Sequence, residues 1–346
     1  MRPRVSHERR RAGECAELRG LMHGPVSLSV VEGALLLGNA PSTTLRLTQR
    51  LNDSHLILTT NTPPMLFGAS TFIWVSPFST QNIDLLAKVK NMGYDIIEIA
   101  VEATDIIDWE LIKTVARDLD LKITISGAFG PERDISSTEP LHRQLGKQYI
   151  IDCIKIAKNV GSPIFGGPVY SAVGKTRIVS DEQKKQERAW CIETLMETGQ
   201  IAADHGVVVG LEPLNRFETD MVNTVDQALS IVQEVSSPSL KIVLDTFHSN
   251  IEEKDIPASV RKIGKDLLCH VQGNESDRGT PGTGHLEWEG IRDALVEIGY
   301  DGAVVIETFG QPSKELARAA CIWRPLANSA DELAEEGLAF YKKMFS

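Results

Sequence analysis

The chain has 346 residues, of which 42% are hydrophobic and 24% charged, and its formal net charge is −11. A chain of this length and composition can form one large globular domain or two smaller ones. It contains no apolar run of the roughly 18 to 20 residues that a membrane-spanning helix needs, and its acidic balance argues against nucleic acid as a main partner, because phosphate binding needs a basic surface.

Residues 1–64 differ in pattern from the rest of the chain. They contain several Gly and Pro, a run of arginines at 9–11, and no sustained hydrophobic periodicity. We predict a weakly ordered N-terminal extension outside the folded domain, with Met65 as an alternative natural start. An organellar presequence is the other interpretation, and the acidic residues within the first 20 positions argue against it.

From Met65 onward, short apolar runs alternate with longer segments of helical periodicity. The expected strands are 67–73, 96–101, 122–126, 162–166, 207–212, 241–245, 267–272 and 303–307. The expected helices are 82–91, 109–119, 139–159, 181–205, 225–235, 288–298 and 330–341. Thr224 stands where the helix 225–235 needs a cap.

Strands that alternate with helices predict a parallel sheet, and eight such units favour a closed (β/α)8 TIM barrel. A doubly wound open sheet is the alternative. It lacks support, because no Gly-rich turn of the GxGxxG type follows the first strand.

Three late strands each end in an acid that the strand alternation points into the barrel: Glu212, Asp245 and Glu307. Barrel enzymes carry their chemistry at this C-terminal end of the strands. Three inward carboxylates at one rim repel one another, and a hard divalent cation such as Mg²⁺ or Mn²⁺ would neutralise them. The alternative is that each acid caps a helix or pairs with an arginine.

The segments that follow these acids are rich in polar residues. Glu212 opens the run Glu-Pro-Leu-Asn-Arg-Phe-Glu, which ends at Glu218, and Asp245 opens Asp-Thr-Phe-His, which ends at His248. His248 by itself reads as an ordinary hydrogen-bonding loop residue. Three positions after a candidate ligand, it becomes a candidate substrate contact.

These motifs resemble the ketose 3-epimerases, the D-tagatose and D-psicose 3-epimerase family of xylose-isomerase-like barrels. The matching segments are 165–170, 211–218, 244–248, 277–284 and 299–307. They keep the family's order along most of the chain after Met65, and residues 1–64 have no counterpart.

The resemblance implies a metal held by Glu212, Asp245, the residue at 272 and Glu307. Position 272 is Gln where the family has His, and Gln272 can still bind a hard cation through its amide oxygen. His270, two residues earlier on the same face, matches a histidine that the family often carries as well. Mn²⁺ is the expected metal, with Co²⁺ or Mg²⁺ as alternatives.

The resemblance also implies the reaction, which is proton transfer at the carbon beside a ketose carbonyl through a metal-stabilised enediolate. Glu212 and Glu307 are the expected catalytic acid and base. The expected substrate-binding residues are Glu218, His248, Arg278 and Trp74. Phe247 could add to an apolar wall, although core packing is the simpler role for it.

Three other functions are open. A lyase acting on 3-oxo-glycosides would use the same metal and base, and the changed residue at 272 would suit a changed substrate. An endonuclease of the same fold conflicts with the acidic balance and the few site histidines. A non-catalytic sugar-binding barrel conflicts with the intact acids.

We expect a small-molecule sugar substrate, no nucleic-acid or membrane partner, and a homo-oligomer. The five cysteines, Cys15, Cys153, Cys191, Cys269 and Cys321, are scattered and lack CxxC spacing, which favours a reducing cytoplasmic location and argues against a thiolate zinc site.

Overall fold

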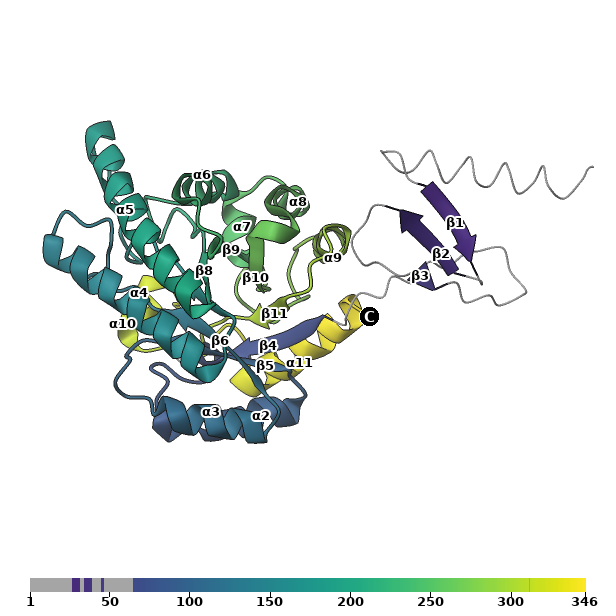
Figure 1. Cartoon of the computed structure of the whole chain (residues 1–346). Coiled ribbons are helices and arrows are strands. Elements are labelled where there is room, and N and C mark those ends of the chain that lie inside the picture. Colours follow the sequence, from purple (N-terminus) through teal and green to yellow (C-terminus); the bar gives the residue numbers. More distant parts are fainter. Residues whose placement is uncertain (1–26, 32–33, 39–44, 47–64, 311) are drawn as a thin grey trace, which may run out of the picture. The chain divides into compact units, whose positions relative to one another are not determined.

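The computed structural model describes residues 27–31, 34–38, 45–46, 65–310 and 312–346 (Figure 1). The chain divides into two compact units, Met1–Pro63 and Pro64–Ser346. In the first unit, β1 (Ser27–Val31), β2 (Ala34–Gly38) and β3 (Leu45–Arg46) form an antiparallel sheet. The sequence did not predict this sheet. Most of the segment for which weak order was predicted lies outside the described residues.

The second unit is a closed barrel of eight parallel strands, which confirms the predicted (β/α)8 fold. The strands are β4 (Leu66–Ser70), β5 (Ile96–Val101), β6 (Lys122–Gly127), β7 (Ile164–Gly167), β8 (Val208–Leu211), β9 (Leu240–Asp245), β10 (Leu268–Gln272) and β11 (Ala303–Ile306). They neighbour one another in chain order, and β11 pairs with β4 to close the ring.

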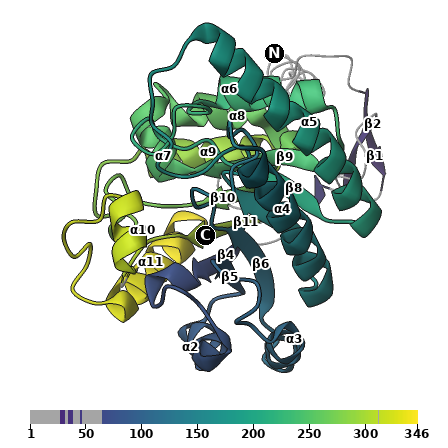
Figure 2. The same ribbon diagram turned by 90° about the vertical axis from the view of Figure 1, so that its left-hand side faces the viewer.

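Helices surround this ring, as Figure 2 shows from a second side. They are α2 (Asp84–Met92), α3 (Trp109–Asp118), α4 (Pro140–Val160), α5 (Asp181–His205), α6 (Val225–Val235), α7 (Thr246–Glu252), α8 (Ile256–Leu267), α9 (Trp288–Glu297), α10 (Lys314–Ala319) and α11 (Ala330–Met344). Thr224 caps α6, accepting a hydrogen bond from the Gln227 backbone, as predicted. No helix in the described part of the chain is long and apolar enough to cross a membrane.

Side chains divide between the two faces of the strands as the alternation predicts. Val209 and Leu211 of β8 belong to the large core between strands and helices. Ala303 and Val305 of β11 pack instead with Ile96 in a separate small cluster. Each strand therefore has one face toward the helices and one toward the barrel interior.

Gly210 of β8 lies where the barrel interior leaves no room for a side chain. A Cβ at this position would come within 2.5 Å of Val243 Cγ2 and 3.0 Å of Cys269 Sγ. We expect Gly210→Ala to lower the free energy of unfolding by about 1–3 kcal/mol, as overpacking does in closely packed cores. Urea unfolding measures the change. Gly130→Ala is the control, because its Cβ would meet nothing within 4 Å, and equal stabilities of the two variants would contradict this packing.

A chain that begins at Met65 should fold and remain active. The first barrel strand begins at Leu66, and all eight barrel strands come from the second compact unit. Circular dichroism and thermal unfolding of the shortened chain, beside the full one, measure the fold, and a comparison of enzymatic turnover measures activity. Loss of soluble protein on this truncation would show that the barrel depends on residues 1–64.

Candidate active site

The three predicted acids occupy the C-terminal ends of their strands. Glu212 directly follows β8, Asp245 is the last residue of β9, and Glu307 directly follows β11. They are only 3%, 1% and 6% exposed, respectively. Buried carboxylates of this kind need compensating partners, and the neighbouring loops supply some of them.

Asp245 is held on both of its oxygens. Oδ1 accepts a hydrogen bond from the Phe247 backbone at 2.7 Å and so caps α7. Oδ2 accepts from Asn274 Nδ2 at 3.0 Å and lies 3.3 Å from Arg278 Nη2. Asp245 therefore both caps a helix and pairs with an arginine, as the alternative interpretation predicted. It does so while lying among the other acids.

Arg278 is the buried cation of the cluster. Its Nη1 donates to the Glu307 backbone carbonyl at 2.9 Å and to Glu307 Oε2 at 3.2 Å. The guanidinium lies over the rings of Phe247 and Phe309, 4.4 and 4.9 Å from their centroids. Phe247 thus packs against a site residue, and it belongs to none of the hydrophobic core clusters of the described residues, so core packing is not supported.

The negative charge of the site exceeds what Arg278 can balance. Four carboxylates act on this one guanidinium: Glu212, Glu218, Asp245 and Glu307. Burial, followed by repulsion from Glu307 and Asp245, raises the pKa of Glu212 well above its usual range. Burial likewise raises the pKa of Glu307 to about 8, against the opposing influence of Arg278. Groups perturbed in this way are typical of functional sites.

His248 has a tautomer that its neighbours determine. Its Nδ1 accepts from the Asn215 backbone N–H at 3.1 Å and from the Asn215 amide at 2.8 Å. Burial and Arg278 lower the pKa of His248 well below its usual range, so the ring is neutral and carries its proton on Nε2. Nε2 lies 3.5 Å from Glu212 Oε1 and 3.0 Å from Arg278 Nη2. On this tautomer both Nε2 and Arg278 Nη2 are donors, so their contact is not a hydrogen bond.

Gln272 ends β10, in register with Asp245 on β9. Its Nε2 donates to Glu98 Oε1 at 3.3 Å, and among the described residues its buried Oε1 has no hydrogen-bond partner. His270 is engaged elsewhere, since its Nε2 lies 2.7 Å from Glu98 Oε2. Glu98, from β5, did not figure in the sequence prediction.

These groups suit a hard cation. Ligand atoms of Glu212, Asp245 and His248 all lie within 4.8 Å of one another. The tautomer of His248 makes its Nε2 a donor and therefore a poor ligand. The oxygen of Gln272, which has no partner among the described residues, and the excess of carboxylates offer oxygen ligands, the type that Mg²⁺ and Mn²⁺ prefer.

Two asparagines support the site, and sequence reasoning did not single them out. Asn274 donates to Asp245 Oδ2 and accepts from the Glu307 backbone N–H at 2.7 Å, so it connects two of the acids. Asn215 donates to Glu218 Oε1 at 2.8 Å as well as holding His248. The only sequence signal for them was their position in polar runs directly after strands.

Trp74 has contacts with helices of the barrel wall. Its Nε1 donates to Asp331 Oδ1 at 2.7 Å, and Lys88 Nζ lies 5.7 Å from the ring centroid. The indole N–H of Trp74 is therefore occupied by Asp331, and one side of its ring is occupied by Lys88. A role of Trp74 in sugar binding stays a prediction.

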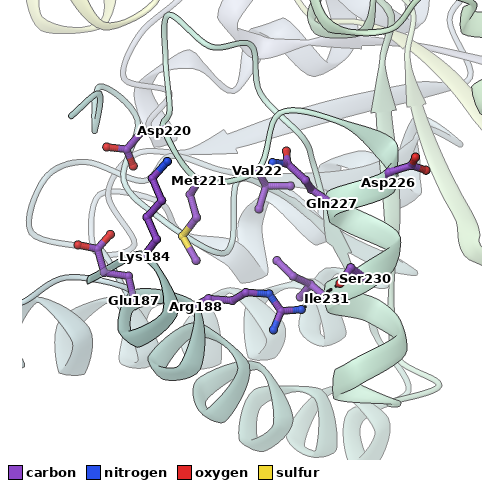
Figure 3. Close-up of a pocket in the computed structure, with 10 residues that line it drawn as sticks. All are labelled: Lys184, Glu187, Arg188, Asp220, Met221, Val222, Asp226, Gln227, Ser230 and Ile231. Atoms are coloured by element: carbon purple, nitrogen blue, oxygen red, sulfur yellow. Dashed lines mark hydrogen bonds between the residues drawn. The ribbon is translucent and has the colours of Figure 1, made fainter. Parts of the chain in front are cut away.

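A pocket of about 350 Å³ lies elsewhere, beside α5 and α6 (Figure 3). Its lining carries both signs of charge, and Arg188 in it donates to Ser230 at 3.1 Å. None of the predicted site residues lines this pocket. The candidate catalytic and metal-binding residues therefore lie at the barrel rim and not in this pocket.

Comparison with known proteins gives a consistent match. Residues 86–344 match the family model described as xylose isomerase-like TIM barrel. A D-psicose 3-epimerase of Ruminiclostridium cellulolyticum is 32% identical over 273 residues, which cover 78% of this chain and 92% of that protein. The crystal structure of a D-allulose 3-epimerase from Methylomonas sp. in complex with D-allulose has a TM-score of 0.76 at 30% identity, covering 82% of this chain and 98% of that one. A 3-keto-D-glucoside 4-epimerase from E. coli has a TM-score of 0.68 at 25% identity, covering 81% and 99%.

Proposed function

The chain belongs to the xylose isomerase-like TIM barrel family, as its motifs predicted, and from this premise we propose that it is a metal-dependent ketose 3-epimerase. Relatives named D-psicose 3-epimerase and D-allulose 3-epimerase support an isomerase, and the sugars in these names are ketoses. The substrate and the metal dependence of this chain are part of the proposal.

The observation that most supports the proposal is the presence of Glu212 and Glu307 at the same barrel rim. Both are buried at one rim, and Glu307 is among the charges that raise the pKa of Glu212. An epimerase needs one group to remove a proton from a carbon and another to return a proton to the opposite face. Two acids from strands on different sides of the barrel opening meet that need.

Each acid has a defined support for this task. Glu307 is held by Arg278 on its side chain and by Asn274 on its backbone N–H. Glu212 lies beside the Nε2–H of His248. We assign the proton transfers to Glu212 and Glu307, and the binding of sugar hydroxyls to Glu218, His248 and Arg278, with Trp74 as a further contact.

The metal ligands in this proposal are Glu212, Asp245, Gln272 and Glu307. A bound divalent cation, Mn²⁺ first among the candidates, would favour negative charge developing on the oxygens of the substrate. Two observations support this ligand set: the excess of buried carboxylates over Arg278, and the Gln272 amide oxygen, which nothing in the described part of the chain hydrogen-bonds.

A panel assay tests the function. Chelated protein receives Mn²⁺, Co²⁺ or Mg²⁺ and is then offered free ketoses and 3-oxo-glycosides, with products separated by chromatography. We expect interconversion of a ketose with its C3 epimer. Absence of epimerisation with every metal and ketose would contradict the proposal.

A lyase acting on 3-oxo-glycosides is the second candidate. The ketose 3-epimerases have His where this chain has Gln272, and this changed ligand favours a substrate other than a free ketose. The similar E. coli structure is that of an enzyme named for a 3-keto-glucoside. Release of an aglycone from a 3-oxo-glycoside, without turnover of free ketoses, would select this candidate.

The remaining expectations concern location and assembly. The described cysteines, Cys153, Cys191, Cys269 and Cys321, are free thiols in the structure, which supports the proposed cytoplasmic location. A homo-oligomer stays a prediction, and light scattering on the purified protein measures it directly.

A further inference from the structure

Glu98 is a buried residue of β5 that contacts three side chains. Its Oε2 lies 2.7 Å from His270 Nε2 and 3.3 Å from Thr124 Oγ1. Its Oε1 accepts a hydrogen bond from Gln272 Nε2 at 3.3 Å. Glu98 and Gln272 are 1% and 2% exposed, so no solvent competes for these contacts.

The contact with Glu98 shows which way the Gln272 amide points. The amide donates from Nε2 to Glu98 Oε1, so its NH₂ end faces this carboxyl group. The amide oxygen then faces away from Glu98. Among the described residues, that oxygen is buried without a hydrogen-bond partner, and such an atom in a native site calls for an explanation.

The position of this oxygen fits the rim of acids. Gln272 is in register with Asp245 on one side and with Val305, two residues before Glu307, on the other.

We propose that Glu98 is a positioning residue that fixes the Gln272 amide with its oxygen toward the cation. This proposal rests on the proposed metal-dependent function and extends it to the choice of metal. With Gln272 oxygen in place of an imidazole, the ligand set is made of oxygen atoms alone. Such a set shifts selectivity toward hard ions such as Mn²⁺ and Mg²⁺, compared with a set that includes a nitrogen ligand.

Calorimetric titration of chelated full-length protein with Mn²⁺ tests the positioning role, and four proteins are compared: wild type, E98Q, Q272H and the double variant. The amide introduced by E98Q can donate as well as accept, so it can turn the Gln272 oxygen away from the cation. We expect E98Q to weaken Mn²⁺ binding roughly 10–100-fold, the range for residues that orient metal ligands. In the Q272H background there is no amide to turn, and we expect E98Q to have a clearly smaller effect.

This cycle separates orientation from general damage to the barrel. A merely structural role would weaken Mn²⁺ binding by the same factor in both backgrounds, and that result would overturn the inference. Unchanged affinity in E98Q would overturn it too, with the metal-dependent function intact. Wild-type protein that binds no Mn²⁺ would contradict the proposed function itself and the inference with it.

A second measurement needs no change at Glu98 and remains informative if E98Q does not fold. The dissociation constants for Co²⁺ and Mn²⁺ are measured for wild type and Q272H. We expect Q272H to strengthen Co²⁺ binding more than Mn²⁺ binding, because imidazole suits the softer ion. An unchanged ratio of the two constants would show that Gln272 is not a ligand, and the inference would fall.

Discussion

Glu212→Gln and Glu307→Gln should each lower turnover by at least roughly 10²-fold, the lower range for loss of a positioned acid or base. The amide keeps the shape of the side chain and one ligand oxygen but cannot take up the proton. Steady-state kinetics measure the loss, and metal occupancy is determined on the same samples, because a weakened ligand would also lower the rate. Glu297→Gln, on the exposed surface of α9, is the matched control and should keep wild-type turnover.

Hydrogen exchange in deuterated water distinguishes the roles of Glu212 and Glu307 in proton transfer. Wild-type enzyme should place deuterium on the carbon beside the carbonyl. If the acids serve opposite faces, one variant should still exchange that proton without inverting the centre, which assigns the faces. Near-native turnover of both variants with metal bound would rule out the two-carboxylate mechanism and leave these acids as parts of the barrel rim.

Removal of the divalent cation should abolish activity, and Mn²⁺ or Co²⁺ should restore it. The physical reason is the charge of the site, where four buried carboxylates surround one guanidinium. Activity after dialysis against a chelator, followed by metal addition, measures the effect.

The thermal midpoint gives the same test without a substrate. A cation that binds the native state alone stabilises it, so the midpoint should rise with Mn²⁺ concentration. Asp245→Asn should reduce this rise, since it removes one negative ligand, whereas Glu297→Gln should leave it unchanged. Full activity in protein shown by elemental analysis to be metal-free would refute the metal requirement.

Most of the barrel could be predicted from alternation of apolar runs, and the errors have local causes. The run 67–73 was predicted as one strand, but the strand ends at Ser70, whose hydroxyl accepts from the Phe72 backbone and begins a short 3-10 helix. Helix α8 was not predicted. It has Pro257 in its first turn, and Gly264, with φ +71°, interrupts its backbone, so the periodic pattern is short.

The candidate site was predictable only in part. Strand alternation indicates which acids point inward, because parity is a local property of a strand. It does not indicate that Glu98 contacts Gln272, since 174 residues separate them and the contact depends on the closure of the barrel. The proton position on His248, in α7, likewise depends on a backbone N–H donated by Asn215 from the loop after β8.

The support that Asn274 gives to two acids at once has an evolutionary consequence. Because its amide donates to the Asp245 side chain and accepts from the Glu307 backbone N–H, a substitution at Asp245 or at Asn274 also disturbs the setting of Glu307. The effects of substitutions in such a connected set do not add. A lineage that acquires a new substrate would therefore change residues outside this connection more readily, and the residues at positions 245 and 274 should be inherited together.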